Sequence, residues 1–151
     1  MNLVRLVTTL FGLGLLIVVP AVADPSETVT VYRSPTCGCC TKWVDHMQEA
    51  GFEVELHEVS DVTAIKRMNG LPARLASCHT ALVGGYLVEG HVPAVEVKRL
   101  LAEKPKIAGL AVPEMPIGSP GMEMPGVKAK PYDVLAFDSD GRTEVFQHYE
   151  P

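Results

Sequence analysis

Three of the four cysteines in this chain lie within four residues, in the segment Cys37-Gly-Cys-Cys40. The preceding residues, 27–33, alternate with β-branched side chains and predict a strand. Residues 42–50 carry apolar side chains at helical spacing and predict a helix that ends at Gly51. The cysteines therefore lie where a strand gives way to a helix, whose unpaired backbone amides and positive dipole end stabilise a thiolate.

The spacing of these cysteines limits how they pair. A disulfide between the adjacent Cys39 and Cys40 would close a strained ring, so the local disulfide that we expect joins Cys37 to Cys40, a C-x-x-C pair. A second disulfide would then have to join Cys39 to Cys78. Four cysteines allow three pairings, and the sequence alone does not choose among them.

Strand and helix patterns continue to alternate beyond the cysteines. Residues 52–57 predict a strand and 61–69 a helix, and a Gly-Gly turn then joins two strand patterns ahead of a helix over residues 93–103. This β-α-β-α-β-β-α order, with a C-x-x-C after its first strand, resembles the thioredoxin fold and predicts an α/β domain. Thioredoxin-like proteins usually carry a cis-proline at the start of the third strand, where this chain has Cys78 and His79, so all four sulfur atoms should converge.

The C-terminal part of the chain has a different composition. Residues 105–131 are rich in proline and glycine, which disfavours a helix or strand and predicts a long loop packed on the domain. Residues 133–137 and 143–148 then predict a β-hairpin. We therefore divide the chain into a thioredoxin-like domain, residues 24–104, and a C-terminal extension, residues 105–151, that packs on the cysteine site.

The N-terminal 23 residues have the pattern of a cleaved secretory signal peptide, with Arg5, an apolar run and the small-residue ending Ala21-Val-Ala23. Export would place the thiols in an oxidising compartment. The whole chain has 13 basic and 18 acidic residues and no basic patch, which argues against a nucleic-acid partner. The rest of the sequence predicts no membrane span, and we expect one domain and a monomer.

Thiolate and thioether are soft ligands that suit Cu(I), zinc or iron–sulfur clusters. A structural zinc site normally takes pairs of ligands from two separated segments, which this chain does not offer, and the spacing for an iron–sulfur cluster is equally poor. Bridging thiolates, in contrast, can share several Cu(I) ions. The extension adds Met115, Met122 and Met124, whose thioethers bind Cu(I) without forming disulfides, so copper fits this set best.

Three blocks of the sequence together resemble the CopG-type proteins of bacterial copper resistance. They are CGCC at residues 37–40, SCHTALVGGYLVEGHVPA at Ser77–Ala94 and GLAVPEMPIGSPGME at Gly109–Glu123. The resemblance covers nearly the whole chain after the expected signal peptide. It implies a thioredoxin-like domain with a C-terminal extension, copper binding around the C-x-C-C motif and an oxidoreductase role in the periplasm.

Carried over residue by residue, the resemblance gives a set of expected functional residues. The expected redox pair is Cys37 and Cys40. The expected copper ligands are Cys37, Cys39, Cys40, Cys78, Met122 and Met124, together with His79 as either a ligand or a supporting residue. The other histidines, His46, His57, His91 and His148, are expected to have structural or solvent-exposed roles, and Glu89 is expected on a solvated face.

The expected function is therefore a periplasmic copper-binding redox protein that holds several thiolate-bridged copper ions and interconverts Cu(I) and Cu(II). A copper efflux system or a periplasmic copper chaperone would be its partner. Two alternatives remain open at this point: a Cu(I) buffer or chaperone without turnover, and a metal-free thiol-disulfide oxidoreductase.

Overall fold

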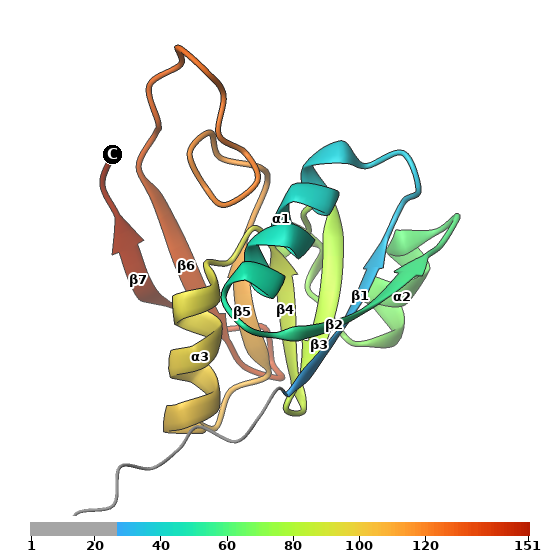
Figure 1. Ribbon diagram of the computed structural model, residues 1–151. Helices are drawn as coiled ribbons and strands as arrows, with labels where there is room; N and C mark the ends of the chain where they lie inside the picture. Colours follow the sequence, from blue (N-terminus) through green and yellow to red (C-terminus); the bar gives the residue numbers. More distant parts are fainter. Residues whose placement is uncertain (1–26) are drawn as a thin grey trace, which may run out of the picture.

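The computed structural model describes residues 27–151, so the expected signal peptide lies outside the described residues. Within them, a seven-stranded sheet and three α-helices form a mixed α/β fold (Figure 1). The strands are β1 (Thr28–Arg33), β2 (Glu53–Glu58), β3 (His79–Val83), β4 (Tyr86–Gly90), β5 (Gly109–Val112), β6 (Tyr132–Phe137) and β7 (Thr143–Tyr149). The helices are α1 (Gly38–Glu49), α2 (Val62–Met68) and α3 (Ala94–Glu103), with a short 3-10 turn at Ala73–Leu75. No helix in this part of the chain is long and apolar enough to cross a membrane.

The order of elements as far as α3 is the predicted one, and so is the hairpin of β6 and β7. The main shift is in the first helix, which begins at Gly38 and not at Lys42. Cys37 is its N-cap residue and has an extended backbone, while Cys39 and Cys40 lie in its first turn. The cysteine segment thus belongs to the start of α1, where backbone amides lack partners within the helix.

The strands lie in the order β2-β1-β3-β4-β5-β6-β7. Strand β1 is parallel to β2 and antiparallel to β3, and β3 is antiparallel to β4. The pairing of β1 with β3 brings the start of β3, which follows Cys78, beside the end of β1, which precedes Cys37. Two cysteine-bearing segments that are far apart in the sequence therefore meet where β1 ends and β3 begins.

Two clusters of buried side chains lie on the two faces of the sheet. The larger one contains Trp43 and Met47 from α1 and Leu100 from α3, so both helices cover the same face (Figure 1). The smaller one lies on the opposite face and includes Leu75 and Leu87. Because side chains alternate along a strand, β3 directs His79 toward the larger cluster and Thr80 toward α2.

One part of the predicted loop 105–131 is a strand. Residues 109–112 form β5, which lies between β4 and β6 and is buried along its whole length. Proline flanks this short apolar run without entering it, so the run is free to pair on both sides. A side chain at Gly109 would collide with the carbonyl oxygen of Leu87, only 1.9 Å from its Cβ position, so close pairing here requires glycine.

The rest of the loop, residues 113–131, packs against the start of α1. Gly121 has a positive φ of +84°, and a Cβ at this position would lie 2.8 Å from the Cys39 carbonyl oxygen and 2.9 Å from the Trp43 amide nitrogen. Such contact is possible only for glycine. The loop backbone therefore reaches the first turn of α1, and the next residue, Met122, is brought to the cysteines.

Candidate metal centre

A disulfide joins Cys37 to Cys40 at the start of α1, as the C-x-x-C spacing predicts. Cys39 and Cys78 are thiols. The Cys39 sulfur lies 3.5 Å from the Cys37 sulfur and 3.9 Å from the Cys78 sulfur. All four sulfur atoms lie within 4.8 Å of one another, which confirms the predicted convergence and makes a group that could hold a metal ion.

Two buried imidazoles extend this sulfur cluster. Cys78 Sγ lies 3.3 Å from His79 Nδ1 and 3.0 Å from His91 Nε2. His91 Nδ1 lies 2.8 Å from the Pro120 carbonyl oxygen, which can only accept, so Nδ1 carries the proton. The lone pair of a neutral His91 is therefore on Nε2 and points at Cys78, whose S–H donates to it.

Burial controls the protonation of these groups. It is the largest cause that lowers the pKa of both His79 and His91, and the neighbouring His91 and Lys66 lower that of His79 further. Burial, reinforced by Cys39, raises the pKa of the Cys78 thiol to about 12. Both imidazoles are thus neutral near pH 7, and in the absence of metal Cys78 keeps its proton.

His91 has the structural role that the sequence interpretation gave it, since it orients the loop through Pro120. Its other nitrogen also belongs to a Cys78, His79 and His91 group whose donor atoms all lie within 4.8 Å and which could hold a metal ion. The strand register contains the signal for this. Thr80 pairs with Glu89, and the same register continued past the strand ends sets His91 opposite Cys78.

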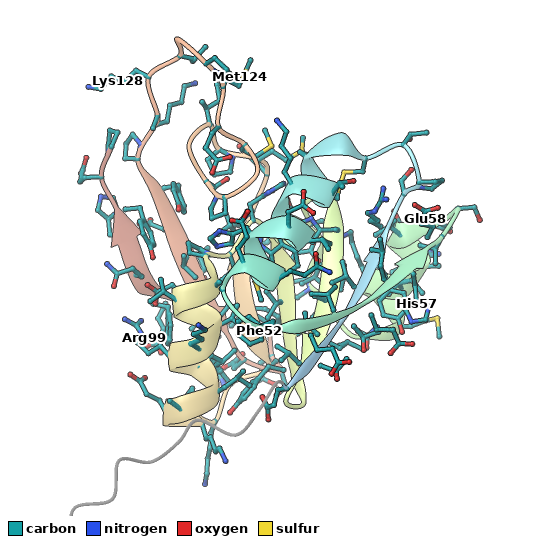
Figure 2. All side chains as sticks on the ribbon, in the orientation of Figure 1. Phe52, His57, Glu58, Arg99, Met124 and Lys128 are labelled. Atoms are coloured by element: carbon teal, nitrogen blue, oxygen red, sulfur yellow. A yellow bond between two sulfur atoms is a disulfide. The ribbon has the colours of Figure 1, made fainter. Side chains whose placement is uncertain are left out.

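The loop and the start of α1 form a hollow on the surface beside the sulfur cluster. This hollow of about 350 Å³ is lined by Gly38, Cys39, Lys42, Gly121, Met122, Glu123 and Met124. Met124 is about half exposed and lies on the loop beside α1 (Figure 2). The structure therefore brings the two predicted methionines to the open side of Cys39. Met115, the weaker candidate, is also exposed but does not line this hollow.

Trp43 forms a wall of the centre. Its side chain is fully buried, its ring lies 4.4 Å from the His79 ring, and its indole N–H donates to the Val92 carbonyl. The hydrogen bond fixes the ring against Val92, the residue that follows His91. Trp43 thus excludes water from one side of the imidazole pair.

Glu89 is fully buried, which contradicts the expectation that it lies on a solvated face. Its carboxylate accepts hydrogen bonds from Lys66 Nζ at 2.5 Å, Thr80 Oγ1 at 2.6 Å and the Ser77 amide at 2.6 Å. Burial raises the pKa of Glu89, and Lys66 is the main opposing influence. This network holds the residue before Cys78 in place from the α2 side of the sheet.

The remaining histidines lie outside the centre, as expected. His46 Nε2 accepts a hydrogen bond from the Ala94 amide at the start of α3. His57 is half-exposed and pairs with Glu55. His148 is also half-exposed and pairs with Asp133 and Glu150.

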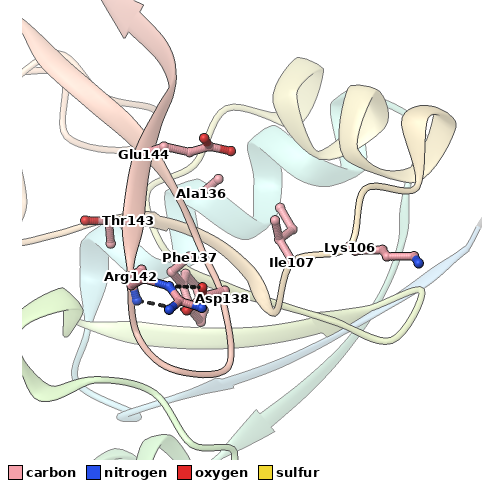
Figure 3. Close-up of a pocket in the computed structure, with 8 residues that line it drawn as sticks. All are labelled: Lys106, Ile107, Ala136, Phe137, Asp138, Arg142, Thr143 and Glu144. Carbon is pink, nitrogen blue, oxygen red and sulfur yellow. Dashed lines mark hydrogen bonds and ion pairs between the residues drawn. The ribbon is translucent and has the colours of Figure 1, made fainter.

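Another hollow, of about 300 Å³, lies far from the sulfur atoms, between the start of β5 and the turn of the last hairpin (Figure 3). Arg142, on its wall, is committed to ion pairs with Asp138 and Asp140, and Lys106 points away from it (Figure 3). It has no set of converging polar groups. The chemistry of the described chain is therefore concentrated at the cysteines.

Comparisons with known proteins agree with this location. A family model described as a protein of unknown function, DUF411, matches residues 75–122, a segment that contains Cys78, His79, His91 and Met122. Two solved structures titled copper resistance protein copG match most of the chain. Form 1 is 40% identical and form 2 is 39% identical, and both have a TM-score of 0.78.

This chain belongs to the CopG family. The alignments cover 85% of this chain and 100% of the form 1 chain, and 83% of this chain and 99% of the form 2 chain. A comparison with curated proteins gave no match. As a CopG relative, the chain is related to copper resistance proteins and carries a cysteine cluster that could bind a metal.

Proposed function

We propose that this CopG relative is an exported copper-binding redox protein that acts in copper resistance. The observation that carries the proposal is a disulfide and two thiols gathered within 4.8 Å. A disulfide supplies redox chemistry, and thiolates close to it supply soft ligands for Cu(I). Plain thiol exchange needs only the Cys37 and Cys40 pair, so Cys39 and Cys78 are available to hold copper.

The donor set fits copper as the cargo of this centre. We assign Cys37, Cys39, Cys40 and Cys78 as sulfur ligands, with the disulfide pair available only after reduction. Met122 and Met124 would close the open side, and His79 is assigned as the predicted nitrogen ligand. To these we add His91, because its Nε2 lone pair already points at the Cys78 sulfur.

The redox step that we propose is balanced by the pair Cys37 and Cys40. Two thiols release two protons and two electrons as they form a disulfide, and two Cu(II) ions each accept one electron to become Cu(I). The same step removes two thiolates from the copper ligands. Oxidation of the pair should therefore weaken copper binding, and reduction should strengthen it.

The remaining assignments follow the same proposal. The order β2-β1-β3-β4 with helices on both faces supports a thioredoxin-like domain over residues 24–104, with residues 105–151 as the extension that closes the metal site. We also propose that the protein holds several thiolate-bridged copper ions and lies in the periplasm after cleavage at Ala23. It would act as a monomer and deliver copper to an efflux system or a copper chaperone. The competing function is a Cu(I) buffer without turnover.

The deciding experiment measures copper bound per chain by protein that begins at Asp24, after full reduction and after oxidation, with an optical spectrum of each. Several copper ions in the reduced form and fewer in the oxidised form are expected. Equal copper in both forms, without reduction of added Cu(II), would favour the buffer. One copper or none in both, with activity on reduced unfolded proteins, would favour a thiol-disulfide oxidoreductase.

A matched variant tests the role of Cys39. Cys39→Ser leaves the Cys37–Cys40 pair intact and should lower the copper stoichiometry of the reduced protein. Thr41→Ser, a neighbouring change outside the sulfur cluster, is the control. Undiminished copper in Cys39→Ser would contradict the assignment of Cys39 as a ligand.

A further inference from the structure

Cys39 occupies the middle of the sulfur cluster. Its sulfur lies 3.5 Å from one sulfur of the disulfide, that of Cys37, and 3.9 Å from the Cys78 thiol on the other side. Cys40, the other half of the disulfide, is fully buried, whereas Cys39 lines the surface hollow. One thiol therefore stands between a disulfide with a buried sulfur and a second thiol.

We infer that Cys39 relays the disulfide within the chain, from the pair Cys37 and Cys40 to the pair Cys39 and Cys78. The relay needs no copper, so it goes beyond the proposed function and stands or falls separately from it. It connects two disulfide isomers of the same oxidation level through a third, the Cys37–Cys39 disulfide.

The relay consists of two thiol-disulfide exchanges. First, the Cys39 thiolate attacks the Cys37 sulfur, an S–S bond forms between them, and the Cys37–Cys40 bond breaks with Cys40 leaving as a thiolate. Then the Cys78 thiolate attacks the Cys39 sulfur, and the Cys37–Cys39 bond breaks with Cys37 leaving. One disulfide exists at every stage, so no oxidant or reductant is required.

The start of α1 suits the leaving groups of both exchanges. Cys37 caps α1 and Cys40 lies in its first turn, where backbone amides and the helix dipole stabilise the leaving thiolates. The protons given up by Cys39 and Cys78 balance those taken up by Cys37 and Cys40. Cys78 is protonated at rest, because burial and Cys39 raise the pKa of its thiol, so the second exchange requires a proton acceptor. His91 Nε2 lies 3.0 Å from the sulfur and is held as an acceptor by the Pro120 carbonyl.

The relay increases the exposure of the disulfide. Before it, the disulfide joins the partly exposed Cys37 to the fully buried Cys40, and after it, the disulfide joins Cys39, which faces the hollow with Met122, to the partly exposed Cys78. A thiol of another molecule reaches a disulfide sulfur only where that sulfur is accessible. Cys39 would then offer a partner thiol a disulfide sulfur at the hollow, in addition to the partly exposed Cys37 of the original disulfide.

Trypsin makes the two isomers easy to separate. It cuts after Arg33 and Lys42, and after Arg74 and Lys98, so Cys37, Cys39 and Cys40 share the peptide 34–42 while Cys78 lies in the peptide 75–98. The Cys37–Cys40 isomer leaves these peptides separate. The relayed isomer joins them covalently.

The test uses metal-free protein that carries one disulfide and two thiols per chain. It is held at pH 8 with a copper chelator, quenched in acid, labelled at free thiols, digested and analysed by mass spectrometry, with monomer confirmed by non-reducing electrophoresis. We expect the joined peptides 34–42 and 75–98 in more than a tenth of the chains, and at least a tenfold lower amount in Cys39→Ser.

Two results would overturn the relay. One is wild-type protein in which the peptides stay separate and both Cys39 and Cys78 are fully labelled, a measurement that requires no variant to fold. The other is an undiminished joined product in Cys39→Ser, since Cys78 would then attack the original disulfide directly. Cys40→Ser is the positive control, because its remaining cysteines should form the joined product after mild oxidation.

Discussion

Removing the positive charge beside Glu89 tests the buried network behind Cys78. In Lys66→Met the side-chain volume is nearly kept, but Glu89 loses its only charged hydrogen-bond partner among the described residues while staying fully buried. Breaking a buried ion pair by removing one partner costs about 3–5 kcal/mol. Because domains are stable by about 5–15 kcal/mol, this is a large share of the free energy of unfolding.

The assay is urea unfolding of the metal-free, disulfide-intact protein, followed by the fluorescence of Trp43, the single tryptophan of the chain. The matched variant is Lys66→Met with Glu89→Gln, which removes the unpaired charge and keeps an acceptor for the Ser77 amide. We expect the double variant to recover at least about 2 kcal/mol of the loss, since an amide is much cheaper to bury than a carboxylate.

The stability lost in Lys66→Met should depend on pH in a definite direction. Burial raises the pKa of Glu89 in the folded protein, and the loss of Lys66 should raise it further. The folded state then binds more protons than the unfolded state above the ordinary carboxyl pKa, so stability rises as the pH falls. The deficit of Lys66→Met should shrink from pH 8 to pH 5. A deficit below about 1 kcal/mol, or a double variant no more stable than the single one, would refute the reasoning.

Two further variants and one titration test the loop and the last hairpin. Gly121→Ala should cost about 1–3 kcal/mol in urea unfolding, because its Cβ meets the Cys39 carbonyl at positive φ, and an unchanged midpoint would contradict the loop position. Met122→Leu should weaken Cu(I) binding about tenfold in a chelator competition, whereas the exposed Met68→Leu should not. Hydrogen bonds to two carboxylates raise the pKa of His148, so its contribution to stability is present below pH 6.5 and is lost as the pH rises through the folded pKa. NMR titration should give a His148 pKa above 6.5, and a value at or below 6.5 would contradict that ion pairing.

Much of the fold follows from local patterns that the sequence displays directly. The alternation in β1, the helical spacing in α1 and the Gly-Gly turn between β3 and β4 each depend on residues that are close in the chain. The disulfide between Cys37 and Cys40 was expected as the local pair for the same reason, since its two residues are three apart, although the sequence left the pairing of all four cysteines open. Short-range geometry is enough to predict such features.

The sequence did not predict strand β5, because this segment becomes a strand only through pairing with the strands on either side of it. The run at residues 109–112 is too short and too close to prolines to be recognised alone, and it becomes a strand by pairing with both β4 and β6. The burial of Glu89 was missed for a similar reason. Its alternation in β4 places it on one face, but only the packing of α2 brings Lys66 over that face.

The sequence by itself determined the element order, the position of the cysteines at a strand-to-helix junction and the presence of enough sulfur for copper. Only the tertiary structure decided that Cys39 stands between the disulfide and Cys78, and that the lone pair of His91 points at Cys78. The donor atoms of these residues, each within 4.8 Å of the others in its group, come from the start of α1, the start of β3 and the residue after β4. Their distances depend on sheet register and on one glycine that lets the loop approach, which no local pattern encodes.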